Sequence, residues 1–137
     1  ALIHSAGKSS LKNIVQTGID KALKFYGMNK DNYYEMIHFT RLFHLDELQQ
    51  TEERDMRSGG YVIETIEAAV WCLITTDSLK ECLLKVVNMG HDTDTVAAVA
   101  GGLAGLYYGV DAIPKDWLDE IVQKEYIEDL CVKASLL

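Results

Sequence analysis

The sequence has 137 residues, of which 48% are hydrophobic, and its formal net charge is −8. This length predicts a single domain with a modest core. The acidic balance argues against nucleic acid or an anionic membrane as a partner, because neither would be attracted to the surface as a whole, and a phosphate-bearing ligand would need a bridging cation.

The spacing of apolar residues predicts two helices in the first third of the chain, over residues 10–26 and 32–43. Gly27 is expected to end the first of them. Residues 46–57 are polar and charged without a clear period, so they predict a loop. The triplet Ser58-Gly59-Gly60 closes this loop.

A strongly apolar helix is predicted over residues 61–75. Its spacing predicts five buried side chains, Val62, Ile66, Ala69, Val70 and Leu73. Glu64 and Glu67 fall on a second face and could form a carboxylate pair. A solvated or salt-bridged face is the simpler interpretation of these two residues.

A short helix over residues 79–88 follows, and Ser78 with Glu81 three residues later predicts a capping box at its start. The polar turn 90–95 then leads into a glycine-rich helix, residues 96–108. Two further short helices are predicted over residues 115–123 and 127–134.

The glycine-rich helix carries two rows of small residues at spacing four. These rows are Ala97, Gly101 and Gly105, and Ala100 and Ala104. A glycine inside a helix costs about 1 kcal/mol relative to alanine. Small residues let neighbouring helices approach closely. We therefore expect this helix to be central and buried, and to hold the preceding polar turn rigidly.

Asp92, Asp94 and Thr95 in the polar turn offer hard oxygen ligands of the kind that Mg²⁺ and Mn²⁺ prefer. The Asp-x-Asp spacing can place two carboxylates on one side, and the hydroxyl of Thr95 adds a neutral ligand. Simple helix capping is the alternative, because Asp and Thr are preferred N-cap residues and acidic residues favour the first turn. A cap uses one such residue, whereas four polar residues precede this apolar helix.

Two segments resemble the ADP-ribosylglycohydrolase family. One is Gly-His-Asp-Thr-Asp-Thr-Val-Ala-Ala-Val-Ala-Gly-Gly-Leu-Ala-Gly-Leu-Tyr-Tyr-Gly at residues 90–109, followed by Ile113-Pro114 and Trp117. The other is Ser-Gly-Gly-Tyr-Val-Ile-Glu-Thr-Ile-Glu-Ala-Ala-Val-Trp at residues 58–71. They follow in the family's order, and the likeness is strong from Arg57 to Trp117 and weak before Asp46.

The resemblance implies an all-α, multi-helix orthogonal bundle, of which residues 1–137 would form one helical domain from the C-terminal part. It also implies magnesium-dependent hydrolysis of the N- or O-glycosidic bond in ADP-ribosylated protein or a related ADP-ribose conjugate. By this likeness, Asp92, Asp94 and Thr95 would be ligands of a pair of Mg²⁺ ions, with Mn²⁺ as a substitute.

The family's N-terminal half supplies the other acidic metal ligands and the catalytic carboxylate, and no segment here matches those motifs. The resemblance therefore implies half of a metal site that is inactive alone. The other half would come from a partner chain or a missing N-terminal half. No residue of this chain is identified as the catalytic acid or base.

Three residues are candidates for lining the substrate pocket. Ser58 and Tyr61 open a helix within one of the two family motifs, with capping for Ser58 and packing for Tyr61 as the ordinary alternatives. His91 stands where the family usually has glycine. It could crowd the turn or donate a hydrogen bond to a phosphate or carboxylate, but simple exposure is favoured.

Two other functions remain open from the sequence. A non-catalytic helical protein that binds ADP-ribose or has a structural role would also explain His91 and the missing acidic residues. An HD-type metal phosphohydrolase is suggested by the dipeptide His91-Asp92, although that class needs further histidines and fits the glycine-rich helix poorly.

Cysteine usage and the lack of targeting signals bear on location. Cys72, Cys82 and Cys131 are odd in number and none forms a CxxC pair, which argues against disulfides and favours buried free thiols in a reducing compartment. No secretory signal opens the chain, and the longest uncharged stretch, residues 96–110, is too short to span a bilayer. We therefore expect a cytoplasmic location.

Overall fold

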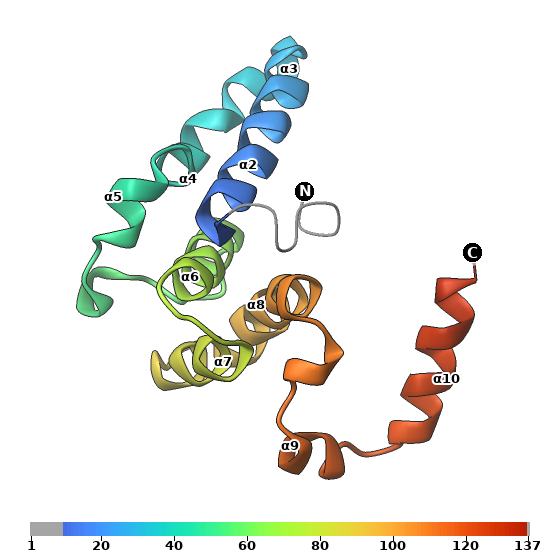
Figure 1. Ribbon diagram of the computed structural model, residues 1–137. Helices are drawn as coiled ribbons and strands as arrows, with labels where there is room; N and C mark the ends of the chain where they lie inside the picture. Colours follow the sequence, from blue (N-terminus) through green and yellow to red (C-terminus); the bar gives the residue numbers. More distant parts are fainter. Residues whose placement is uncertain (1–9, 137) are drawn as a thin grey trace.

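A computed structural model describes residues 10–136 (Figure 1). Over this range the chain forms only α-helices, 3-10 helices and connecting turns, which confirms the all-α prediction. The first helix, α2, spans Leu11–Gly27 and ends at the predicted glycine. Ser10 caps its start, because the Ser10 side chain accepts a hydrogen bond from the backbone N–H of Asn13 at 3.4 Å.

The predicted second helix is broken into three pieces. They are α3 (Lys30–Tyr33), the 3-10 helix η1 (Glu35–Phe39) and α4 (Thr40–Phe43). Leu42 is the only one of these residues that is buried. Since most helical stability in proteins comes from packing of an apolar face, this segment has little to hold it in one regular helix.

The segment predicted as a loop, residues 46–57, contains all but the first residue of the short helix α5 (Leu45–Gln49) and the whole 3-10 helix η2 (Glu53–Asp55). Leu45 and Leu48 are both buried and lie three residues apart, on one face of α5. The loop prediction was wrong here because two apolar anchors within a charged stretch suffice for a single turn of helix.

Three helices form the centre of the molecule: α6 (Val62–Ile74), α7 (Leu79–Asn88) and α8 (Thr93–Tyr108). α6 is buried at ten of its 13 residues. α7 contributes Leu79, Cys82 and Val86 to the core, at helical spacing. Two details of the α6 prediction were wrong, because Val62 is exposed and Ile66 is only half-buried.

The glycine-rich helix, α8, was expected to be central and buried, and burial holds for one face only. It buries one row, Val96, Ala100 and Ala104, against α6 and α7, while Ala98, Gly102 and Leu106 are exposed. Close packing accounts for Gly101, where a Cβ atom would lie 3.4 Å from Cδ2 of Leu83. It does not account for Gly102 or Gly105, where a Cβ atom would meet nothing within 4 Å.

The predicted capping box at the start of α7 is present. Oγ of Ser78 accepts from the backbone N–H of Glu81 at 3.1 Å, and Oε2 of Glu81 accepts from the N–H of Asp77 at 3.1 Å. The Glu81 carboxylate thus reaches one residue further back than the standard box requires. This bonding fixes the direction in which α7 leaves α6.

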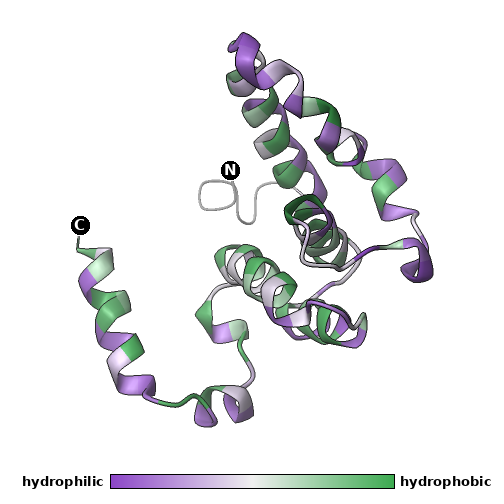
Figure 2. Ribbon diagram, turned by 180° about the vertical axis from the view of Figure 1, so that it is seen from behind, coloured by the Kyte–Doolittle hydropathy of each residue, from purple (hydrophilic) through white to green (hydrophobic). Residues whose placement is uncertain are grey.

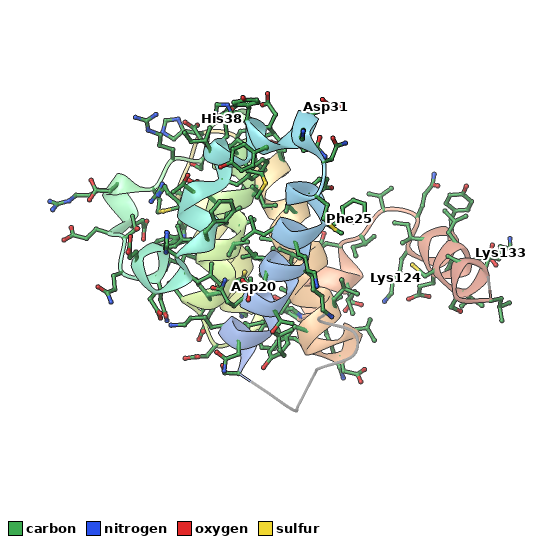
Figure 3. The ribbon with its side chains drawn as sticks, turned by 90° about the horizontal axis from the view of Figure 1, so that it is seen from above. Asp20, Phe25, Asp31, His38, Lys124 and Lys133 are labelled. Carbon is green, nitrogen blue, oxygen red and sulfur yellow. The ribbon has the colours of Figure 1, made fainter. Side chains whose placement is uncertain are left out.

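The chain ends in the 3-10 helix η3 (Val110–Ala112), α9 (Lys115–Asp119) and α10 (Lys124–Ser135). None of the residues of α10 is buried, and it stands apart from the other helices in two views (Figures 1 and 3). Polar and apolar residues alternate along it (Figure 2). No helix in the part of the chain that the structure describes is long and apolar enough to cross a membrane.

Two of the three cysteines are buried free thiols, as predicted. They are Cys72 on α6 and Cys82 on α7, and burial raises the pKa of Cys72 to about 12. Cys131 on α10 is also free but exposed, so burial was wrong for this residue. The exposure follows from the position of α10, which has no buried residue and stands apart from the other helices (Figures 1 and 3).

Candidate metal centre

The polar turn before α8 has an unusual backbone. Gly90 and His91 both have positive φ, at 76° and 64°. Glycine adopts this left-handed region readily, but a non-glycine residue there is uncommon and costs free energy. The chain therefore reverses sharply just before Asp92, the residue that precedes the first helical residue, Thr93.

The carboxylate of Asp92 does not cap α8. No side-chain cap hydrogen bond is made at this position, and Oδ1 of Asp92 instead accepts from Oγ1 of Thr95 at 2.9 Å. Helix capping was the alternative to metal binding for this residue, and Asp92 does not perform it through its side chain. Its carboxylate is directed toward the hydroxyl of a second predicted ligand.

Asp94 lies in the first turn of α8, close to the other two candidates. Its Oδ1 accepts from the backbone N–H of Thr95 at 2.9 Å. The pKa of Asp94 lies below its ordinary value, because its carboxyl group shares a hydrogen bond with that of Asp92 and also accepts from backbone N–H groups. Thr95 thus bonds to both carboxylates, to that of Asp92 through its hydroxyl and to that of Asp94 through its backbone N–H.

The three side chains form a donor set that suits a hard divalent cation. They offer two carboxylates and one hydroxyl, with no thiolate or imidazole among the ligating groups. Asp94 and Thr95 are exposed and Asp92 is half-buried, so an ion can reach them from solvent. Within residues 10–136, no three His, Cys, Asp or Glu side chains gather as a possible metal site, so these two carboxylates have no third acidic neighbour there.

The Ser-Gly-Gly turn before α6 lies directly against this candidate centre. Oγ of Ser58 donates to the carbonyl oxygen of Gly90 at 3.1 Å, and the carbonyl oxygen of Ser58 accepts from the N–H of Asp92 at 3.0 Å. A Cβ atom on Gly60 would lie 3.3 Å from Oδ2 of Asp92. The fold thus joins two turns that are separated by about thirty residues in the sequence.

The three predicted pocket residues lie in different surroundings. Ser58 is buried and its side chain is bonded to the turn, whereas Tyr61 and His91 are exposed. Tyr61 precedes the first residue of α6, and its carbonyl oxygen accepts from the N–H of Thr65. The sequence did not reveal the contact of Ser58 and Gly60 with Asp92. The only available signal was that both motifs place a polar turn just before an apolar helix.

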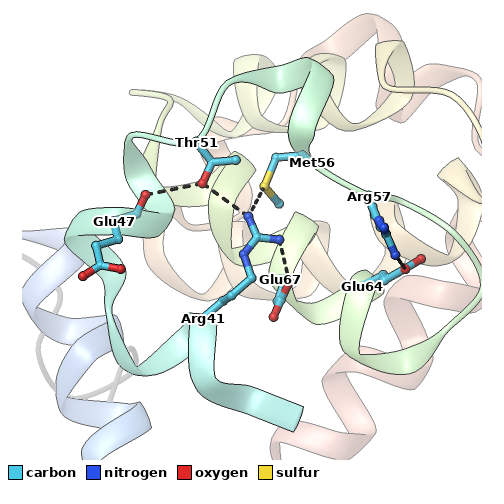
Figure 4. A network of polar contacts seen from close by, with 7 residues as sticks. All are labelled: Arg41, Glu47, Thr51, Met56, Arg57, Glu64 and Glu67. Atoms are coloured by element: carbon cyan, nitrogen blue, oxygen red, sulfur yellow. Dashed lines mark hydrogen bonds and ion pairs between the residues drawn. The ribbon is translucent and has the colours of Figure 1, made fainter. Parts of the chain in front are cut away.

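Glu64 and Glu67 are salt-bridged, as the simpler interpretation of the sequence predicted (Figure 4). Glu64 pairs with Arg57 at 3.4 Å and Glu67 with Arg41 at 3.0 Å. Glu67 is buried, which raises its pKa above the ordinary value of 4.5, although the charge of Arg41 opposes this rise. No local pattern predicted Arg41 as the partner, because it comes from α4.

The guanidinium of Arg41 joins three further parts of the chain. Its Nη2 donates to Oγ1 of Thr51 at 3.3 Å and to Sδ of Met56 at 3.4 Å, while Nη1 binds Glu67 (Figure 4). This network holds the segment after α5 against α6. It serves the packing of the fold and does not extend to the Asp92 turn.

A groove lies elsewhere, between α2 and the segment from α3 to α4. It has a volume of about 500 Å³ and is lined mainly by apolar side chains, including Ile19, Tyr26, Met36 and Phe39. None of the residues of the two polar turns lines it. The groove therefore lacks the convergent polar groups expected of a catalytic pocket.

Comparison with known proteins gives a consistent result. A family model described as ADP-ribosylglycohydrolase matches residues 1–137. The chain is 44% identical over 89 residues to the ADP-ribosylarginine hydrolase Tri1 of Serratia proteamaculans, covering 65% of this chain and 24% of that protein. It is 37% identical over 89 residues to the glycohydrolase of ADP-ribosyl-dinitrogen reductase from Rhodospirillum rubrum, covering 65% of this chain and 28% of that protein.

A more distant similarity is found to human ADP-ribosylhydrolase ARH3, at 31% identity over 87 residues. This match covers 53% of the chain and 24% of the human protein. The chain thus spans about a quarter of the length of the curated relatives that it matches.

Proposed function

This chain belongs to the ADP-ribosylglycohydrolase family, and we propose that it provides half of a magnesium centre for cleaving the glycosidic bond of an ADP-ribose conjugate. The observation that carries the proposal is the meeting of three oxygen-bearing side chains at one turn. At the start of α8, the hydroxyl of Thr95 donates to Asp92 and the backbone N–H of Thr95 donates to the carboxylate of Asp94. Relatives whose names state hydrolysis of ADP-ribosylated substrates support the class of reaction.

Asp92, Asp94 and Thr95 would hold the cation, and bound Mg²⁺ would supply Lewis acidity and orientation for the ribose and diphosphate groups. The contribution of this chain is to fix the positions of those oxygens. The bond from Thr95 to Asp92 keeps hydroxyl and carboxylate adjacent, and the Ser-Gly-Gly turn holds the N–H of Asp92 in place. None of these three residues is assigned a proton transfer.

The proposal of a half-site is supported by the small number of donors at the turn. Mg²⁺ requires nearly octahedral ligation, and one turn with two carboxylates and a hydroxyl fixes few of its positions. In the described part of the chain, no third acidic side chain joins them. Further ligands and the catalytic acid or base would come from another polypeptide segment or a partner chain. Presence in the cytoplasm is part of the same proposal.

Paramagnetic line broadening by Mn²⁺, used as a stand-in for Mg²⁺, tests the metal site. Added Mn²⁺ should broaden the amide NMR signals of residues 91–96 first, and the double variant Asp92→Asn with Asp94→Asn should lose this selectivity. The matched control replaces two exposed aspartates outside the turn, Asp111→Asn with Asp116→Asn. Equal broadening in both double variants would mean that the acidic surface attracts Mn²⁺ without a site.

An activity assay tests the half-site separately. The 137-residue chain with Mg²⁺ should not hydrolyse ADP-ribosyl-arginine or O-acetyl-ADP-ribose, because the catalytic carboxylate is not in this chain. Full turnover by the chain alone would refute the half-site. Calorimetry with ADP-ribose and Mg²⁺ then separates a ligand-binding role from a structural one.

A further inference from the structure

Ser58 opens one of the two family motifs and makes two hydrogen bonds to the other, on either side of His91. Its Oγ donates to the carbonyl oxygen of Gly90 at 3.1 Å, and its carbonyl oxygen accepts from the N–H of Asp92 at 3.0 Å. We propose that Ser58 is a positioning residue, which orients the Asp92 carboxylate for the cation without touching ligand or metal. This inference rests on the proposed metal site.

The burial of Ser58 separates this role from substrate binding. The residue is 3% exposed, and its single hydroxyl proton is used in the bond to Gly90. A substrate hydroxyl or phosphate could not receive that hydrogen bond without breaking the link between the two turns. The side chain is therefore committed to the backbone of the metal-binding turn.

The turn needs such support because its backbone is strained. Gly90 and His91 adopt left-handed φ values in succession, and for His91 this conformation persists only if surrounding contacts favour it. The two bonds from Ser58 fall on the residues at either side of His91. Removing the Oγ donor should release the Gly90 side of the turn first.

Gly60 makes a second, independent contribution to the position of Asp92. A Cβ atom on Gly60 would lie 3.3 Å from Oδ2 of Asp92, which is tighter than ordinary van der Waals contact. The missing side chain leaves the space that the carboxylate occupies. Because Mg²⁺ tolerates little deviation from octahedral geometry, a shift of this oxygen should weaken binding.

The experiment measures Mn²⁺ affinity and the Tm of the full 137-residue chain in matched pairs of variants. Ser58→Ala removes the Oγ donor, and Ser78→Ala removes a hydroxyl that accepts a 3.1 Å cap bond at the start of α7. We expect Ser58→Ala to weaken Mn²⁺ binding by about tenfold, as loss of an orienting partner commonly does. Ser78→Ala should lower Tm comparably and leave the affinity unchanged.

A pair of glycine variants tests the positioning of Asp92 without removing a hydrogen bond. Gly60→Ala should weaken Mn²⁺ binding several-fold, whereas Gly102→Ala, whose Cβ meets nothing within 4 Å, should not change it. The positioning role is overturned if wild type binds Mn²⁺ at the turn and Ser58→Ala binds equally well. It is also overturned if Ser78→Ala loses affinity in proportion to its loss of Tm. Absence of Mn²⁺ binding in wild type would reject the metal site itself, and the role of Ser58 with it.

Discussion

α6 and α8 are both apolar helices that follow a polar turn, yet they differ sharply in burial. α6 buries ten of its 13 residues, whereas α8 buries three of its 16. α6 packs against α5, α7 and α8, while α8 packs on α6 and α7 through one row of small residues. An apolar sequence thus favours burial of a helix, but the packing of neighbouring elements determines how many of its residues are buried.

The same contrast holds for the acidic residues on the two helices. Burial raises the pKa of Glu67 on α6, and Arg41 offsets part of that effect. The pKa of the exposed Asp94 on α8 is lowered by its hydrogen bonds to Asp92 and to backbone N–H groups. One carboxylate is thus buried in a salt bridge within the fold, and the other is exposed to solvent.

A pair of leucine truncations tests the difference in burial and should give the largest effect on stability. Leu73→Ala on α6 should lower the free energy of unfolding by about 3 kcal/mol, because it leaves a cavity in the core. Leu106→Ala on α8 should cost about 1 kcal/mol or less, since this side chain is 51% exposed. Urea denaturation measures both. An equal cost at Leu106 would mean that the open face of α8 is covered in solution.

Loss of the Arg41 charge should give the next largest effect. Arg41→Met leaves Glu67 buried without its partner, which should cost about 2 kcal/mol at pH 7, given that Arg41 is partly exposed. The folded-state pKa of Glu67 is raised, so its ionisation destabilises the fold as pH rises above 4.5. The cost of Arg41→Met should therefore shrink toward pH 4.5 and below, where Glu67 is protonated in both states.

The double variant Arg41→Met with Glu67→Gln is the control for this prediction. It removes both charges, so most of the pH dependence caused by Glu67 should disappear. Denaturation curves recorded across the acidic range would measure it. If the loss of unfolding free energy in Arg41→Met did not change with pH, that result would show that Arg41 acts through packing against Thr51 and Met56 and not through its charge.

Glycine substitutions on α8 should give the smallest change in stability, and this change should be an increase. Gly102→Ala should raise the free energy of unfolding by about 1 kcal/mol, because the position is helical and open. Gly101→Ala should gain less, since its Cβ would press on Leu83 at 3.4 Å. Thermal unfolding compares the two. Destabilisation by Gly102→Ala would indicate that another surface packs closely on this face.

Much of the fold was predictable because it depends on local spacing. The ends of α2 and α7 and the existence of α6 and α8 follow from apolar periodicity and from capping residues such as Ser78. The break between α3 and α4 and the helix α5 were not predictable in this way. They depend on which side chains, such as Leu42 and Leu45, find a partner in the core.

For the candidate site, the order of side chains along one turn offered Asp92, Asp94 and Thr95 as hard oxygen donors, because donor chemistry is a local property. Their assignment as metal ligands came from the family resemblance and stays a prediction. Only the tertiary structure brought Ser58 and Gly60 against Asp92, since those contacts join turns about thirty residues apart. The tertiary structure alone also determined that α8 is buried on one face only. Burial and long-range hydrogen bonds arise from the packing of helices on one another, and no single helix contains that information.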